Sequence, residues 1–156
     1  MTFASNEKFG VRRALQIDAG HISDFNIAMA LETEGKPLDS ETVHGGVQAV
    51  LSRNDLGFYV VAEHLDKPVG QLLITYEWSD WRNAFFWWIQ SVYVAPEYRH
   101  QGVYRALHKY VSEAADRQGD VCGIRLYVDK DNKIAQGVYA GLGMSEPNYY
   151  MYEIEF

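Results

Sequence analysis

The stretch "EYRHQGVYRALHKYV", Glu97 to Val111, combines basic residues, a single glycine and an apolar periodicity. Gly102 lacks a Cβ atom, so it can adopt the dihedral angles of a loop whose backbone N–H groups surround an anion. The apolar spacing predicts a helix from about Gly102 to Arg117, and a helix N-terminus carries unpaired N–H groups. Together these features suit a phosphate group. A solvated turn before an amphipathic helix is the alternative interpretation.

The charge of the whole chain makes this local basic cluster unusual. The 156 residues carry a formal net charge of -7. Duplex nucleic acid requires a broad basic surface, so we expect no nucleic acid partner, whereas a cationic small molecule suits the overall charge. Four basic residues nevertheless gather around one glycine: Arg99, His100, Arg105 and Lys109.

The surrounding pattern predicts alternating strands and helices. A strand-like run at 10–17 precedes a helix that Asp18 can cap, and Asp39 or Ser40 can cap a second helix. Three strand-like runs with short connections, 58–64, 68–78 and 84–94, favour an antiparallel meander. The remaining predicted elements are the helix at 102–117, a buried strand at 121–128, a helix at 132–143 and an alternating strand at 148–156.

This order predicts the fold class α/β (α+β), with about four helices and a mixed, mostly antiparallel central sheet. A strand, a helical crossover and another strand imply one parallel pair within that sheet. We expect one domain over residues 1–156, because the length suits a single core and no Pro/Gly/Ser linker interrupts the chain.

Two motifs at a characteristic separation make the chain similar to the GNAT superfamily of N-acetyltransferases. The run "SVYVAPEYRHQG", Ser91 to Gly102, resembles its strand and pyrophosphate loop, whose pattern is Gln or Arg, two residues, Gly, one residue, then Gly or Ala. Arg99 to Tyr104 follow this pattern except at Tyr104. The second motif of the family is matched by Asn132, Ala135, Tyr139, Gly143 and Met144.

The resemblance implies acetyl-CoA as the acyl donor, and the residue spacing itself leads us to expect no metal. In the family the parallel strand pair splays apart, and the pantetheine arm enters the gap. The backbone of Val92, Tyr93 and Val94 would bind that arm. The pyrophosphate would accept N–H groups from Gln101, Gly102, Val103, Tyr104 and Arg105, with His100 at the rim. Asn132 either caps the following helix or hydrogen-bonds the pantetheine.

The same resemblance makes Tyr139 the expected general acid. A phenol has a pKa near 10 and stays protonated at neutral pH, so it can donate a proton to a departing thiolate. The attacking amine must instead lose a proton. Glu77 is the first candidate for the base, and Asp80 or a water held by Gln90 are alternatives; a solvated surface role is the competing interpretation for Glu77.

Other sequence signals give little support to different chemistry. Cys122 lies in an apolar strand without an activating partner nearby in sequence, and the five histidines show no metal-ligand spacing. No apolar run is long enough to span a bilayer, and nothing indicates an oxidising compartment, so we expect a cytoplasmic protein without a membrane partner.

The sequence therefore predicts an acetyl-CoA-dependent N-acetyltransferase. It would act on a primary amine of a small molecule or peptide, by direct attack in a ternary complex. The resemblance is also compatible with a homodimer. The alternative from another class is a non-catalytic acyl-CoA-binding sensor or partner domain.

Overall fold

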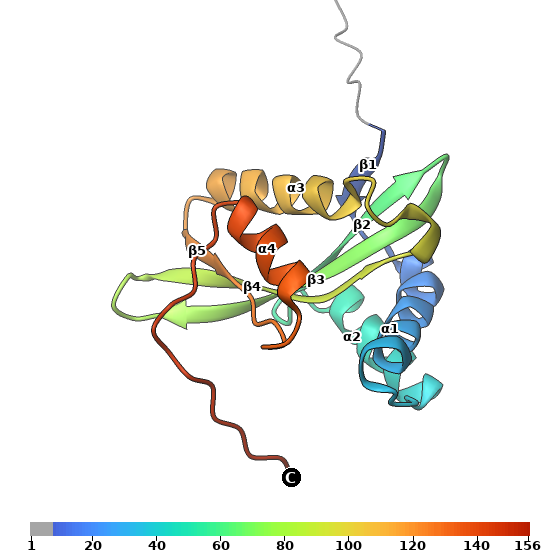
Figure 1. Cartoon of the computed structure of the whole chain (residues 1–156), viewed down its shortest axis with the longest axis horizontal. Coiled ribbons are helices and arrows are strands. Elements are labelled where there is room, and N and C mark those ends of the chain that lie inside the picture. The colour runs from blue at the N-terminus through green and yellow to red at the C-terminus, as the bar shows by residue number, and fades with distance from the viewer. Residues whose placement is uncertain (1–7) are drawn as a thin grey trace, which may run out of the picture. The chain divides into compact units, whose positions relative to one another are not determined.

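The computed structural model describes residues 8–156, which contain four α-helices and five strands (Figure 1). They divide into two compact units, one ending at Leu126 and the other spanning Tyr127–Phe156. The first unit contains β1 (Gly10–Arg13), the 3₁₀ turn η1 (Gln16–Asp18), α1 (Ala19–Glu34), α2 (Ser40–Ser52), β2 (Phe58–His64), β3 (Lys67–Ser79), β4 (Ala84–Val94), η2 (Pro96–Tyr98), α3 (Val103–Gln118) and β5 (Val121–Arg125). The second contains α4 (Lys133–Gly141).

The strands of the first unit form one sheet in the order β1-β2-β3-β4-β5. The first four strands pair antiparallel in the predicted meander, and β5 pairs parallel with β4. The α3 helix provides the crossover between these two strands, because parallel strands cannot be joined by a tight turn. The predicted mixed sheet with one parallel pair is thus confirmed.

Helices cover both faces of this sheet (Figure 1). On one face, α3 contributes Val103, Leu107 and Val111 to the larger core, where they pack with strand residues such as Leu72 and Ile74. On the other face, a smaller core forms between α1, α2 and the first strands of the meander; its buried members are Ala19, Ile22, Val47, Tyr59 and Val61. Buried apolar area on both faces fixes the register of the strands.

The helix starts follow the predicted capping pattern at one site and depart from it at another. The Asp39 side chain accepts a hydrogen bond from the Thr42 N–H at 2.8 Å and caps α2, so Asp39 is the cap among the two predicted candidates Asp39 and Ser40. Asp18 precedes α1 but makes no side-chain cap. Its buried carboxylate instead accepts from the Leu15 N–H and from both terminal nitrogens of Arg12, because a buried charge requires charged and hydrogen-bonding partners.

The second unit differs from the sequence prediction at its end. The predicted strand at 148–156 is not formed, and the residues after Gly141 adopt neither helix nor strand. Alternation of side chains gives a segment one apolar face, but a strand also needs a neighbour for its backbone N–H and C=O groups. The large exposed side chains of this segment are Tyr149, Tyr150, Met151, Tyr152, Ile154 and Phe156.

Among residues 8–156, no helix combines the length and apolar character needed to cross a membrane.

Candidate active site

A bulge interrupts β4 shortly before its end. Tyr93 pairs with Gln71 and Gln90 pairs with Leu73, so two residues of β4 lie opposite the single residue Leu72 of β3. Ser91, within the bulge, has a φ of 51°, a left-handed conformation that is uncommon for a residue with a side chain. A bulge bends the strand that contains it, so the last residues of β4 run in a different direction toward the loop that follows.

The parallel pair ends well before β4 does. The β4–β5 ladder runs only from Phe85 and Val121 to Trp88 and Arg125, whereas β4 continues to Val94. Within the described residues, the 89–94 stretch therefore has β3 as its only neighbouring strand. Backbone groups on the other edge are directed away from β3, where an extended ligand could pair with them. The role of Val92, Tyr93 and Val94 in such pairing stays a prediction.

The loop after β4 has the geometry of an anion site. His100 and Gly102 both have positive φ angles, 60° and 88°, and α3 begins directly afterwards at Val103. No side chain caps this helix. A Cβ atom on Gly102 would meet no other atom within 4 Å, so the space above the loop is open and the dihedral angle alone requires glycine. The first-turn N–H groups of α3 have no intrahelical acceptors and face this loop.

Arg99 holds the loop in place and does not contribute an open positive charge. Its Nε donates to the Val94 carbonyl at 2.9 Å, and its Nη2 donates to the Glu32 carboxylate at 2.9 Å. The guanidinium also lies 5.5 Å from the centre of the Tyr93 ring. The hydrogen bond from Arg99 lowers the pKa of Glu32. The exposed side chains of His100 and Arg105 remain as the basic groups of the loop itself.

Tyr104, the departure from the family pattern, packs into the protein. Its side chain lies against the larger core, and its ring centre is 6.0 Å from that of His108. A bulky residue is tolerated at this position because the side chain points toward the core while the backbone begins the helix. The N–H of Tyr104 thus belongs to the first turn without obstruction from its own ring.

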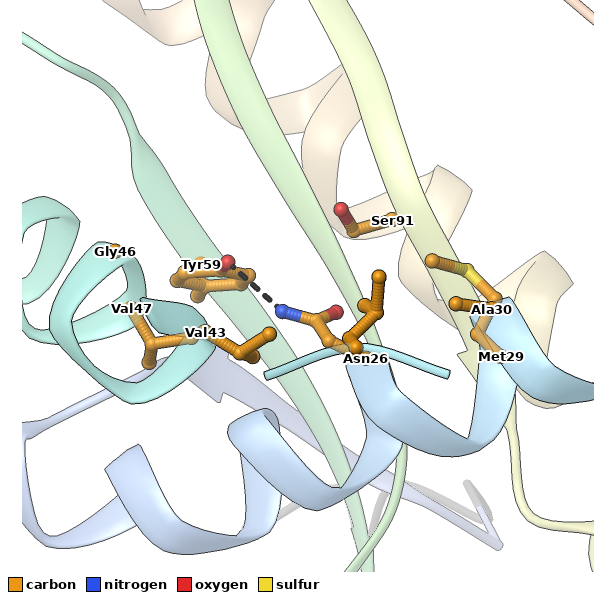
Figure 2. A pocket seen from close by; sticks show the side chains of 9 residues that line it. Asn26, Met29, Ala30, Val43, Gly46, Val47, Tyr59 and Ser91 are labelled. Atoms are coloured by element: carbon orange, nitrogen blue, oxygen red, sulfur yellow. Dashed lines mark hydrogen bonds between the residues drawn. The ribbon is translucent and has the colours of Figure 1, made fainter. Parts of the chain in front are cut away.

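A cavity of about 270 Å³ lies between α1, α2, β2 and β4 (Figure 2). Ser91 of the β4 bulge forms one side of it, and Asn26 of α1 donates a hydrogen bond from Nδ2 to the Tyr59 hydroxyl at 3.3 Å. Apolar groups form most of the remaining wall, which comprises Met29, Ala30, Leu38, Val43, Gly46 and Val47. The cavity is therefore adjacent, through Ser91, to the part of β4 that has a free edge.

Gln71 connects this cavity with the bulge. Its side chain is fully buried, and its Nε2 donates to Asn26 Oδ1 at 2.8 Å and to the Ser91 carbonyl at 3.2 Å. Because both partners accept, the orientation of the Gln71 amide is fixed. This network was not predicted from the sequence. A single amide in the apolar run "VGQLLIT" was the available signal, since a buried polar side chain needs partners.

Glu77 lies away from the bulge and already has partners. Its carboxylate accepts from Arg125 Nη1 at 2.8 Å and from Trp88 Nε1 at 3.1 Å. Glu77 pairs with Phe86, five residues before Ser91, which corresponds to roughly 16 Å along a strand. The structure does not bring Glu77 to the cavity, and its role as a base stays a prediction.

The two alternatives for the base lie at different places. Asp80 is exposed at the turn between β3 and β4, where it accepts from the Trp81 N–H at 3.0 Å. Gln90 directly precedes the bulge, and its Nε2 donates to Thr75 Oγ1 at 2.6 Å. Of the three candidates, Gln90 is the one next to Ser91 in the chain.

In the second unit, Asn132 caps α4, with its Oδ1 accepting from the Ala135 N–H at 3.1 Å. The capping function that the sequence predicted as one option is thus present, and its role toward a ligand stays a prediction. Tyr139 lies on the same helix, and burial raises its pKa above the usual value. The Tyr139 carbonyl accepts from the Met144 N–H at the helix end, where Gly143 has a φ of 87°.

Comparisons with known proteins agree with this geometry. A crystal structure described as a possible acetyltransferase from Clostridium difficile 630 is 45% identical in sequence, with a TM-score of 0.89 over 96% of this chain and 99% of that chain. The aminoglycoside N-acetyltransferase AAC(6')-Iy, solved with CoA, has a TM-score of 0.74 at 14% identity over 99% of both chains, a likeness in fold.

Two sequence comparisons complete this result. Thialysine N-epsilon-acetyltransferase of Bos taurus is 34% identical over 96 residues, which make up 56% of this chain and 55% of that protein. This chain thus matches only about half the length of that relative. The model of the acetyltransferase (GNAT) family matches residues 25–144 and includes both the loop after β4 and the α4 motif. The chain belongs to the acetyltransferase (GNAT) family.

Proposed function

We propose that the protein transfers an acetyl group from acetyl-CoA to a primary amine by direct attack in a ternary complex. The observation that carries this proposal is the end of β4. It is bulged at Ser91, pairs among the described residues only with β3 from Ile89 to Val94, and leads into a left-handed loop at an uncapped helix N-terminus. An extended arm ending in a pyrophosphate matches this sequence of features.

The residues of the proposed cofactor site act mainly through their backbone. The free edge at Val92, Tyr93 and Val94 would pair with the pantetheine arm. Main-chain N–H groups of the loop and first helical turn would donate to the pyrophosphate; these are Gln101, Gly102, Val103, Tyr104 and Arg105. His100 lies at the rim of that loop. Asn132 keeps one amide group for the pantetheine, because its Oδ1 is used for the α4 cap.

The thioester supplies an activated acetyl group, and this chain supplies the proton transfers. The amine nitrogen forms a bond to the acetyl carbon while the bond from that carbon to sulfur breaks. The sulfur takes up a proton from the Tyr139 hydroxyl. The attacking ammonium first loses one proton to bulk solvent through a water that Gln90 would hold beside the bulge, and the proton lost as the amide forms restores the Tyr139 hydroxyl. Since an alkylamine has a pKa near 10.4, this deprotonation is needed at neutral pH.

Replacement of Glu77 tests the first candidate for the base. We expect Glu77→Gln to lower kcat by less than about threefold, because the carboxylate is bound to Arg125 and lies far from the bulge. The acidic limb of the pH profile of kcat/KM should also be preserved. A hundredfold loss together with disappearance of that limb would instead identify Glu77 as the base. Gln90→Leu is the matched comparison, and it should show the larger loss.

The proposed function itself is tested by release of CoA thiol. The purified chain should release free thiol from acetyl-CoA only when a primary amine is present, with formation of the acetylated amine confirmed by mass spectrometry. Tight CoA binding without thiol release from any amine would favour the acyl-CoA-binding module. ATP bound more tightly than CoA would contradict both assignments.

A further inference from the structure

The wall of the cavity described above indicates the kind of amine that the protein accepts. Ser91 lines the cavity, and the next residues of β4 provide the proposed cofactor edge. An acceptor placed in the cavity would therefore approach the reacting end of the cofactor along a continuous piece of backbone. This inference rests on the proposed function.

No charged side chain is among the nine lining residues. Met29, Val43 and Val47 give the wall an aliphatic surface, and the polar groups are confined to Asn26, Tyr59 and Ser91. A second ammonium group placed against this wall would find no carboxylate among the lining side chains to replace its contacts with water. The acidic residues that give the chain its net charge of -7 are thus not among the residues that line the cavity.

The polar part of the wall is built to stay fixed. The Tyr59 hydroxyl accepts from Asn26 and retains its own proton for donation, and Tyr59 is only 4% exposed. Asn26 is held in turn by Gln71, which also holds the Ser91 carbonyl of the bulge. One buried amide therefore couples the α1 side of the cavity to the β4 side, so both keep one relative position.

We propose that this cavity selects monoamines with an uncharged apolar body and discriminates against polycations. Met29, Val43 and Val47 contact the body of the acceptor, and Asn26 and Tyr59 are positioning residues at its polar end. At about 270 Å³ the cavity is at the small end of ligand sites, so the favoured body is a short aliphatic chain or a single ring.

Three amines that differ in length and charge, hexylamine, ethylamine and spermidine, test this selectivity with acetyl-CoA as the donor. Hexylamine should have a kcat/KM roughly 30-fold above that of ethylamine, because each buried methylene adds favourable transfer energy. Hexylamine should likewise exceed spermidine by at least tenfold. Calorimetric titration of hexylamine into the complex with CoA should give binding that spermidine does not give. Equal or better turnover of spermidine would overturn the proposal and leave the acetyltransferase function intact.

Variants of the α2 side of the cavity connect the selectivity to its wall. Val43→Glu places a carboxylate in the aliphatic surface and should lower kcat/KM for hexylamine at least tenfold, with the Kd for CoA unchanged. Glu41→Gln changes an exposed residue of the same helix and should leave both values as in the wild type. If Val43→Glu does not fold, Val43→Thr keeps the side-chain shape and should raise the KM for hexylamine about threefold at unchanged kcat.

The outcomes separate the two proposals. Thiol release with preference for hexylamine, lost in the Val43 variants, supports both. Thiol release without loss in these variants overturns the assignment of the cavity and keeps the proposed function. Failure of every amine to release thiol from a chain that binds CoA overturns both together.

Discussion

Gly102→Val is expected to weaken CoA binding about 100-fold. Gly102 has a φ of 88°, which a β-branched residue adopts only at considerable cost, so the variant loop must rearrange. Rearrangement turns the N–H groups of the loop and of the first turn of α3 away from a common centre. The pyrophosphate would then lose several charge-assisted hydrogen bonds at once. Isothermal titration with CoA measures the effect.

Gly119 provides a matched control at the other end of α3. It has a φ of 84°, and a Cβ atom there would also meet no atom within 4 Å. Gly119→Val therefore introduces the same kind of strain and should lower the Tm by a similar amount, with little change in the Kd for CoA. Wild-type affinity in Gly102→Val, or equal loss in Gly119→Val, would contradict the assignment of the loop.

The sequence predicts the elements around this loop well because their signals are local. Pro96 ends β4 since proline cannot donate to a ladder, and the apolar spacing after Gly102 has the period of a helix. The left-handed conformation of Gly102 follows from the residue type. Short connections between β2, β3 and β4 similarly leave antiparallel pairing as the simplest arrangement. Elements and order could therefore be predicted without a structure.

Contacts between side chains of different elements were beyond such a prediction. The basic residue Arg99 looked like part of an anion site, yet Glu32 pairs with it across 67 positions of sequence. Asp18 has a residue type that favours capping, but Arg12 offers a stronger partner for a buried carboxylate. At 148–156 the alternating pattern was clear, while the absence of a neighbouring strand has no local signal. In each case a tertiary partner, or the lack of one, determines the outcome.

The candidate site likewise has one part that local sequence motifs predict and another part that depends on tertiary contacts. The loop and the end of β4 could be located from motifs, since backbone groups of consecutive residues form them. The cavity could not, because its polar residues Asn26, Tyr59 and Ser91 come from three separate elements and meet only in the fold. Side-chain chemistry such as the choice of base is equally nonlocal. Glu77 has a suitable residue type, but pairing of β3 with β4 places it beside Phe86.

Tyr139→Phe is expected to lower kcat about 100-fold while the Kd for CoA changes less than twofold. The variant keeps the ring and its packing and removes only the hydroxyl, so the loss falls on proton donation to the departing sulfur. Since burial raises the pKa of Tyr139, the hydroxyl stays protonated throughout the neutral range, and wild-type kcat should not decline until the solution is strongly alkaline.

Tyr152→Phe, at a residue that is 93% exposed, should behave like the wild type. Stopped-flow measurement of single-turnover rates in both variants separates the chemical step from product release. An unchanged single-turnover rate in Tyr139→Phe would show that another group protonates the sulfur, whereas a lower rate with unchanged CoA affinity would place the hydroxyl at the reacting atoms.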